Sequence, residues 1–151
     1  MWNWLKKLVL KYARKGLYKA VDRLDDYKDE LRAIVDKYVN PEEIADVVLG
    51  FVKDQLKALI NKVFGWFKRL IGGKIVDIVV ETLNASINGL DKFKPEIVKL
   101  IEDNVNADEL VDIAVNFVKE KLYDAIDAII PEDVDQALAL LQQKVRAKFG
   151  R

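Results

Sequence analysis

The sequence predicts an all-α protein, a bundle of about seven helices, and three observations lead to this fold class. Residues 39–64 align without a gap on residues 105–130, with nine identities in 26 positions and an offset of 66. Apolar residues recur at helical spacing in both stretches. A helix-capping asparagine opens each of them, Asn40 in one and Asn106 in the other. A helical unit repeated at this length is typical of a pseudo-symmetric bundle or a helical array.

The repeat divides the chain into two copies and a tail. At the same offset, residues 9–64 and 75–130 share 14 identities in 56 positions. With a four-residue gap, the aromatic and basic stretch that contains Trp4 also matches the one that contains Trp66. We therefore expect one all-helical domain over 1–151, with repeat 1 at 2–64, repeat 2 at 66–130 and a C-terminal helix at 131–151.

Each copy is expected to hold three helices. The first helix covers about 2–23 in one copy and 74–88 in the other, and the second covers about 26–38 and 95–104. Residues 75–80, IVDIVV, have high strand propensity, but their counterpart at 9–14 lies among strong helix formers, so both are expected to be helical. Asn88 and Gly89 predict a helix stop, and Gly72 with Gly73 predicts a break between the copies.

The third helix of each copy has the clearest sequence pattern. Asn40 suits the N-cap, Pro41 suits the first helical position, and Glu43 completes a capping box. Asn106 and Glu109 repeat this arrangement. The expected apolar stripe is Ile44, Val47, Val48, Phe51 and Leu59 in the first copy, and Leu110, Ile113, Ala114, Phe117 and Ala125 in the second.

A seventh helix is expected to begin at Pro131 and to run to about Phe149, without a counterpart in the first copy. Its apolar stripe would consist of Leu138, Leu141, Val145 and Phe149.

The formal charge of the chain is zero, but the charges are segmented along it. The balance is +6 over 1–21, −5 over 22–50, +5 over 53–74, −10 over 75–138 and +4 over the last eight residues. Blocks of this kind indicate contacts between complementary surfaces, within the chain or between copies of it. We expect self-association or docking in which the acidic face of repeat 2 meets the basic termini.

The composition argues against an enzyme. The sequence contains no histidine and no cysteine, and its hydroxyl side chains are Ser86 and Thr82 apart from the tyrosines. A nucleophilic triad and a thiolate metal site both need residues that are missing. The carboxylate cluster at residues 22–30 could hold a hard cation, but a solvated or helix-capping role is favoured for these acids. We expect no cofactor and no metal.

Two segments that mix aromatic and basic residues are the candidate contact sites, one at the N-terminus and one at the junction between the copies. On a helical wheel Leu5, Val9, Tyr12, Ala13 and Ala20 share one side, opposite Lys7, Lys11, Arg14, Lys15 and Lys19. One interpretation, which we favour, is that the aromatics anchor the core or an interface; the other is that the segments lie on an anionic membrane. The candidate interface or membrane-contact residues are Trp2, Trp4, Lys6, Lys7, Lys11, Trp66, Phe67, Lys68 and Arg69.

The sequence thus favours a non-enzymatic structural or interaction protein that acts through helical surfaces as a subunit of a larger assembly, such as a phage or virion particle. The alternative is a peripheral membrane-binding protein that uses its basic, tryptophan-containing segments. Nucleic acid is not expected as a partner, because the acidic block opposes phosphate binding. No glycine-rich phosphate loop indicates a small-molecule substrate. Without a signal peptide or a membrane-spanning run, the expected location is cytoplasmic or particle-associated.

Overall fold

The computed structural model describes residues 3–38, 40–71, 73–103 and 106–150, and every regular element in these ranges is a helix. This confirms the all-α class that the sequence predicts. In chain order the elements are α1 (Asn3–Asp22), the 3₁₀ segment η1 (Arg23–Tyr27), α2 (Lys28–Val35), α3 (Pro41–Ile71), α4 (Gly73–Asn88), the 3₁₀ segment η2 (Gly89–Phe93), α5 (Lys94–Glu102), α6 (Ala107–Ile129) and α7 (Val134–Phe149).

These elements join into fewer separate rods than the sequence predicts. The chain passes from α1 through η1 into α2, and from α4 through η2 into α5, without leaving helical structure. The described residues therefore form five uninterrupted rods, and the expected division into three separate helices per copy was wrong. As predicted, the α-helix α4 ends at Asn88, but the chain continues in helical structure, because η2 keeps it turning until Phe93 (φ −90°, ψ 0°) precedes α5. In the first half η1 and Tyr27 (φ −96°, ψ 1°) join α1 to α2 in the same way.

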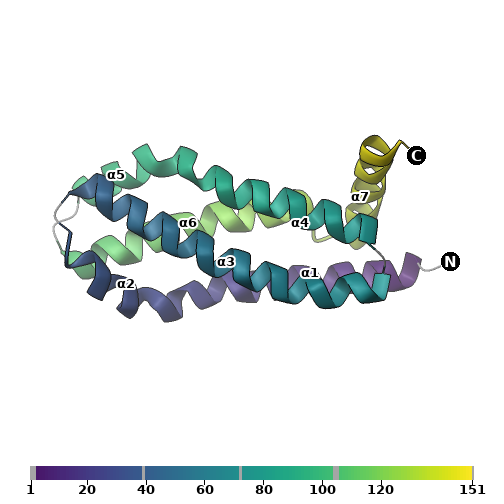
Figure 1. Ribbon diagram of the computed structural model, residues 1–151, viewed down its shortest axis with the longest axis horizontal. Coiled ribbons are helices and arrows are strands. Elements are labelled where there is room, and N and C mark those ends of the chain that lie inside the picture. The colour runs from purple at the N-terminus through teal and green to yellow at the C-terminus, as the bar shows by residue number, and fades with distance from the viewer. Residues whose placement is uncertain (1–2, 39, 72, 104–105, 151) are drawn as a thin grey trace.

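Four of the rods run along the long axis of the molecule, as Figure 1 shows. The α1–η1–α2 rod packs against both α3 and α6, and the α4–η2–α5 rod packs against the same two helices. The end of α2, the start of α3, the end of α5 and the start of α6 lie at one end of the bundle, and α7 lies across the other end, in contact with α1 and α4 (Figure 1). The start of α1 and the end of α3 also lie at the end that α7 covers.

Apolar side chains from all seven α-helices form one buried cluster. In α3 the most buried positions are Ala45, Val48 and Val52, each 0% exposed. Val48 belongs to the stripe that the sequence predicts, whereas Val47 and Phe51 lie at the edge of the buried face. The start of this helix is as predicted: the Asn40 side chain accepts a hydrogen bond from the Glu42 backbone N–H at 2.8 Å.

The last helix, α7, begins three residues after the predicted start at Pro131. Asp133 is extended (φ −72°, ψ 107°), and its carboxylate accepts hydrogen bonds from the backbone N–H groups of Asp135 and Gln136, so it is the N-cap and the helix begins after it. Leu138 and Leu141 are buried as expected, and Val145 packs against the core. Phe149 is 41% exposed and does not continue the buried stripe.

The two halves of the bundle, α1–α3 and α4–α6, keep the 66-residue offset in their architecture. The starts of η1 and η2, of α2 and α5, and of α3 and α6 are each 66 residues apart. Tyr27 packs edge-to-face on Phe51 with ring centroids 5.6 Å apart, and the equivalent Phe93 packs edge-to-face on Phe117 at 5.9 Å.

The halves differ at their C-terminal boundaries. The helix α3 continues to Ile71, so residues 66–71, where the second copy is expected to begin, are the last residues of this helix. The reason is local: the sequence has no proline between Pro41 and Gly72 that would end the helix, and Gly65 is tolerated within it. None of the helices in the described ranges is both long and apolar enough to cross a membrane.

Candidate interaction surface

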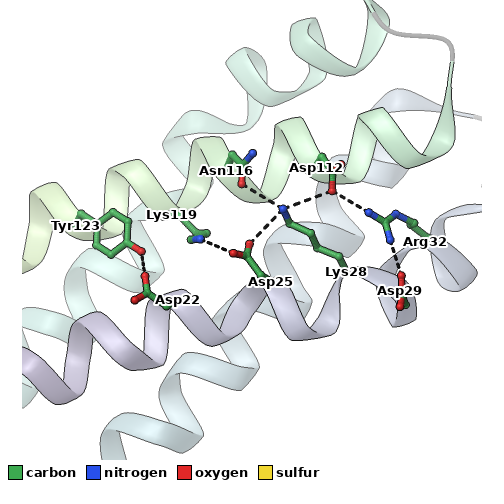
Figure 2. A network of polar contacts seen from close by, with 9 residues as sticks. All are labelled: Asp22, Asp25, Lys28, Asp29, Arg32, Asp112, Asn116, Lys119 and Tyr123. Atoms are coloured by element: carbon green, nitrogen blue, oxygen red, sulfur yellow. Dashed lines mark hydrogen bonds and ion pairs between the residues drawn. The ribbon is translucent and has the colours of Figure 1, made fainter.

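The contact between the two halves is lined by a ladder of polar side chains, which Figure 2 shows for the side where the α1–η1–α2 rod meets α6. Tyr123 donates a hydrogen bond to Asp22, and Lys119 donates to Asp25 at 2.8 Å. Lys28 lies 3.2 Å from Asp25, 3.4 Å from Asp112 and 3.3 Å from Asn116. Arg32 extends the ladder, with donor distances of 2.8 Å to Asp112 and 2.5 Å to Asp29.

The central rungs of this ladder recur on the opposite side of the bundle with the halves exchanged. Lys119 pairs with Asp25, and its equivalent Lys53 pairs with Asp91 at 2.8 Å. In the same way, the Lys28–Asp112 pair has a counterpart in Lys94–Asp46, at 3.0 Å. In both cases a lysine of one half contacts an aspartate of the other half, and the equivalent lysine and aspartate make the same contact with the two halves exchanged. This is the pattern of a two-fold symmetric interface. Each of these four charged positions carries the same amino acid in both halves of the sequence.

Hydrogen bonding across this contact shifts the pKa values of three groups. The hydrogen bond from Lys119 lowers the pKa of Asp25 below its ordinary value. The hydrogen bond to Asp46 raises the pKa of Lys94. Burial and the hydrogen bond to Asp22 together raise the pKa of Tyr123 well above the ordinary value of 10.0. All three shifts favour the charge state that the folded contact needs at neutral pH.

The basic N-terminal helix meets acidic residues of the second half and of α7. Arg14 lies 2.7 Å from Asp127 and donates to the carbonyl oxygen of Ile130 at 2.8 Å. Tyr18 donates to Asp127 at 2.6 Å. Burial alone would raise the pKa of Asp127, but these hydrogen bonds hold it below its ordinary value. Part of the complementary charge in the sequence is therefore satisfied within the chain.

The outer face of α1 remains open to solvent, and we define it by six residues. Trp4, Leu8 and Tyr12 follow one another at four-residue intervals and are 64%, 41% and 55% exposed. Three exposed lysines lie on the same arc of the helix, because positions three or four residues apart share a face. The six residues are Trp4, Leu8, Lys11, Tyr12, Lys15 and Lys19. The opposite side of α1, with Val9, Leu10, Ala13, Leu17 and Val21, is buried in the core.

This arrangement corrects two expectations. Tyr12 does not share the buried side with Val9 and Ala13, because it lies about 60° around the helix from Val9, at the margin of the apolar side, and turns outward. Trp4 does not anchor the core, since its side chain is largely exposed. Leu8, Tyr12, Lys15 and Lys19 belong to the surface but not to the predicted site residues, although the Trp4–Leu8–Tyr12 spacing was visible in the sequence.

The other predicted site residues are distributed as follows. Lys6 and Lys7 are half-buried, and Lys7 pairs with Asp135 at 2.5 Å. Lys68 and Arg69 are exposed at the end of α3, where Lys68 lies 3.1 Å from Asp77. Trp66 and Phe67 lie in α3, but their side chains are outside the described part of the structure, as is the whole of Trp2.

The fold gathers the charge blocks at opposite ends of the bundle. The end with α7, the first five turns of α1 and the second half of α3 comprises the described residues 3–21, 53–71, 73–88 and 119–150, with 17 basic and nine acidic residues. The other end comprises the described residues 22–38, 40–52, 89–103 and 106–118, with seven basic and 16 acidic residues. We call these the basic end and the acidic end. The outer face of α1 belongs to the basic end.

Two cavities lie close to α1. A surface hollow of about 630 Å³ is lined by Lys11, Arg14, Lys15, Tyr18, Lys19, Glu132 and Val134. A cavity of about 20 Å³ lies inside the bundle, where Gly16, Ala20 and Ser86 are among its lining residues. Across the described ranges, no three or more Asp or Glu residues converge on a point that could hold a metal ion.

Comparisons with known proteins do not assign this chain to a family. A DNA mismatch repair protein MutS from Treponema denticola is 29% identical over 100 residues, which are 66% of this chain and 11% of that protein. The chain thus spans about a tenth of the length of that relative. No family model matches the sequence. No solved structure matches it either.

Proposed function

We propose that this protein is a non-enzymatic interaction protein that docks into a larger assembly through the outer face of α1. The observation that carries the proposal is the exposed row of Trp4, Leu8 and Tyr12. Large apolar side chains gathered on a solvent-facing surface are typical of contact sites. A phage or virion particle is one assembly in which such a subunit would serve.

The chemistry of the described residues supports a non-enzymatic role. Thr82 donates its hydroxyl to the carbonyl oxygen of Ile78, which is an intrahelical bond. Ser86 lines the small internal cavity, among apolar neighbours. The carboxylates of the ladder between the halves pair with lysines, an arginine and a tyrosine (Figure 2). Their role is to hold the two halves together.

We further propose that the two halves are diverged copies of one helical unit, each consisting of a broken rod and a long helix. The common 66-residue offset of the elements and the exchanged pairs Lys119–Asp25 and Lys53–Asp91 support this origin. A unit that pairs in this way would first have formed a symmetric dimer. Fusion of the copies then lets their outer faces diverge, so that α1 carries an interaction surface that α4 lacks.

The relative from Treponema denticola is named a DNA mismatch repair protein, which raises DNA as a partner. We propose a different partner class as the leading one, because the match covers only 11% of that protein and the sequence contains no recognised nucleic-acid-binding motif. The experiments below distinguish DNA from other partners of the protein.

A photo-crosslinking amino acid placed at Leu8 tests the proposed surface in the full chain. In material from the natural source, we expect adducts at Leu8 and far fewer when the same amino acid replaces the exposed Lys62 of α3. The adducts should disappear when Lys11, Lys15 and Lys19 are replaced by glutamine. Equal labelling at Leu8 and Lys62 would mean that the outer face of α1 is not a docking site.

A further inference from the structure

We infer that the component of the larger assembly that the outer face of α1 contacts is the surface of an anionic lipid bilayer, an inference that rests on the proposed function. The face combines a tryptophan, a tyrosine and a leucine with three lysines, all solvent-exposed. Tryptophan and tyrosine prefer the interface between hydrocarbon and water, and lysine is attracted by anionic headgroups. No acidic residue occurs in the chain before Asp22, so none of the six residues of the face repels such a surface.

The lysines distinguish a lipid surface from a protein partner. Three of the six residues of the face are lysines, and they lie on the same arc of the helix as the apolar residues, with Tyr12 between Lys11 and Lys15 in the sequence. Lysine is depleted at protein–protein interfaces, where burial of its ammonium group is unfavourable. On a bilayer the long aliphatic part of lysine can lie against the acyl chains while its ammonium group remains among the headgroups. The mixture is therefore favourable at a lipid surface and unfavourable inside a protein interface.

The shape around α1 also suits a headgroup layer. The hollow beside the helix holds four cationic side chains and one acidic residue, Glu132. Arg14 is already paired with Asp127, but among the described residues Lys11 and Lys19 have no acidic partner. Phosphate groups of lipids at the level of the aromatic rings would enter this hollow.

The charge separation along the bundle sets the orientation. From Asp22 onward the exposed residues of the same rod are mainly acidic, among them Asp26, Asp29 and Glu30. An anionic surface attracts α1 and repels the η1 and α2 segments. The bundle should consequently attach by its basic end, with the acidic end tilted away from the lipid.

Flotation of the full-length protein with vesicles tests this inference. Vesicles of two parts phosphatidylcholine to one part phosphatidylglycerol should carry the protein upward at low salt, whereas pure phosphatidylcholine should not. Replacing Lys11, Lys15 and Lys19 by glutamine should weaken partitioning by about 100-fold, at roughly fivefold for each lysine. The matched control replaces Lys37, Lys62 and Lys99, which gives the same net charge, and should retain most of the binding.

A second set of variants tests the apolar part of the face. Replacing Trp4 by alanine and Leu8 and Tyr12 by serine should also release the protein from vesicles, with an unchanged helical circular dichroism spectrum because these residues are outside the core. In a chain in which Trp2 and Trp66 are phenylalanine, Trp4 emission should move to shorter wavelength on addition of the anionic vesicles.

The outcomes separate the two proposals. No flotation at low salt, or flotation that neither set of variants reduces, would overturn the lipid inference. If the Leu8 crosslinks were then to a protein, to DNA or to a second copy of the chain, the docking surface would stand with a different partner. If Leu8 gave no specific crosslink and vesicles did not bind, both proposals would fail.

Discussion

Lys119 donates a hydrogen bond to Asp25 at 2.8 Å, and this contact joins the second half of the chain to the first. Its equivalent on the other side of the bundle, Lys53 with Asp91, has the same 2.8 Å separation. The pairs are not equally exposed: Lys119 is 14% exposed and Lys53 is 21% exposed. An approximate two-fold relation therefore governs the contact between the halves, with small differences in solvation.

Double-mutant cycles should show coupling in both exchanged pairs. For Lys119 and Asp25, and for Lys53 and Asp91, we expect a coupling energy of about 0.5 kcal/mol, because the carboxylates are partly solvated. The more buried pair should give the larger value. Urea unfolding of the single and double alanine variants measures these energies. Lys68 and Asp77 are the control and should couple less, because the Lys68 side chain is 55% exposed. Coupling in only one exchanged pair would contradict the two-fold relation.

Acidification should weaken the contact between the halves. In the folded protein the pKa values of Asp25 and Asp127 are below the ordinary value of 3.8. The two carboxylates therefore make their full contribution to the free energy of unfolding above pH 3.8. It is lost as the pH falls through their lowered pKa values. The double variant Asp25→Asn, Asp127→Asn should accordingly be less stable at neutral pH and should lose less stability below about pH 4. Chemical unfolding over a pH series measures this, with the exposed Asp26→Asn as a control.

Two tyrosines should ionise late in an alkaline titration. Burial, followed by the hydrogen bonds to Asp127 and Asp22, raises the pKa values of Tyr18 and Tyr123 above 10.0. Because the folded state favours the neutral phenols, their stabilising effect is complete below pH 10 and decreases as the pH rises above it. The near-ultraviolet absorbance of phenolate follows the titration. The late phase should shrink in Tyr18→Phe and Tyr123→Phe, and its persistence in the double variant would refute the assignment.

Gly16→Ala should stabilise the protein. Gly16 lies inside α1 and lines the small internal cavity, and a methyl group there would meet no atom within 4 Å. Alanine in a helix interior is favoured over glycine by about 0.5–1 kcal/mol. Thermal unfolding should show a raised midpoint. The control is Gly150→Ala at the end of α7, where φ is +77° and alanine should cost about 1 kcal/mol; a Gly16→Ala protein less stable than wild type would show that the cavity is not open as described.

Replacement of Leu141 and replacement of Phe149, two residues of the apolar row in α7, should differ strongly in their effect on the stability of the protein. Leu141 is 0% exposed, and replacing it by alanine should cost about 2–5 kcal/mol through the cavity that results. Phe149 is 41% exposed, and its replacement by alanine should change stability by about 1 kcal/mol or less. Denaturant unfolding compares the two variants. Equal losses would mean that Phe149 is packed into the core.

The fold class followed from features that act within one helix. The cap at Asn40 and the apolar spacing after it depend on residues a few positions apart, so the sequence predicts them directly. The helical state of residues 75–80 was also predicted correctly, because the repeat gave information that strand propensity alone lacks. The end of α4 at Asn88 was predicted correctly, but the 3₁₀ segment after it was not, because Asn88 and Gly89 are compatible with both a full stop and a 3₁₀ turn.

The candidate surface was predicted in part. The N-terminal segment was recognised by its tryptophans and lysines, but the wheel assigned Tyr12 to the buried side. A helical wheel gives angles around an axis, and it does not say how wide the buried arc is, since neighbouring helices decide that. The packing of α3, α6 and α7 against α1 leaves Tyr12 outside and draws Arg14 to Asp127.

The sequence by itself determined the helical class, the 66-residue repeat and the segmented charge, since each is a property of residue order. Only the tertiary structure decided that Lys119 meets Asp25 while Lys53 meets Asp91, and that the charge blocks gather at opposite ends of one bundle. Such contacts join residues about 40 to 90 positions apart, and the path of the chain through space, not the order of its residues, brings them within hydrogen-bonding distance.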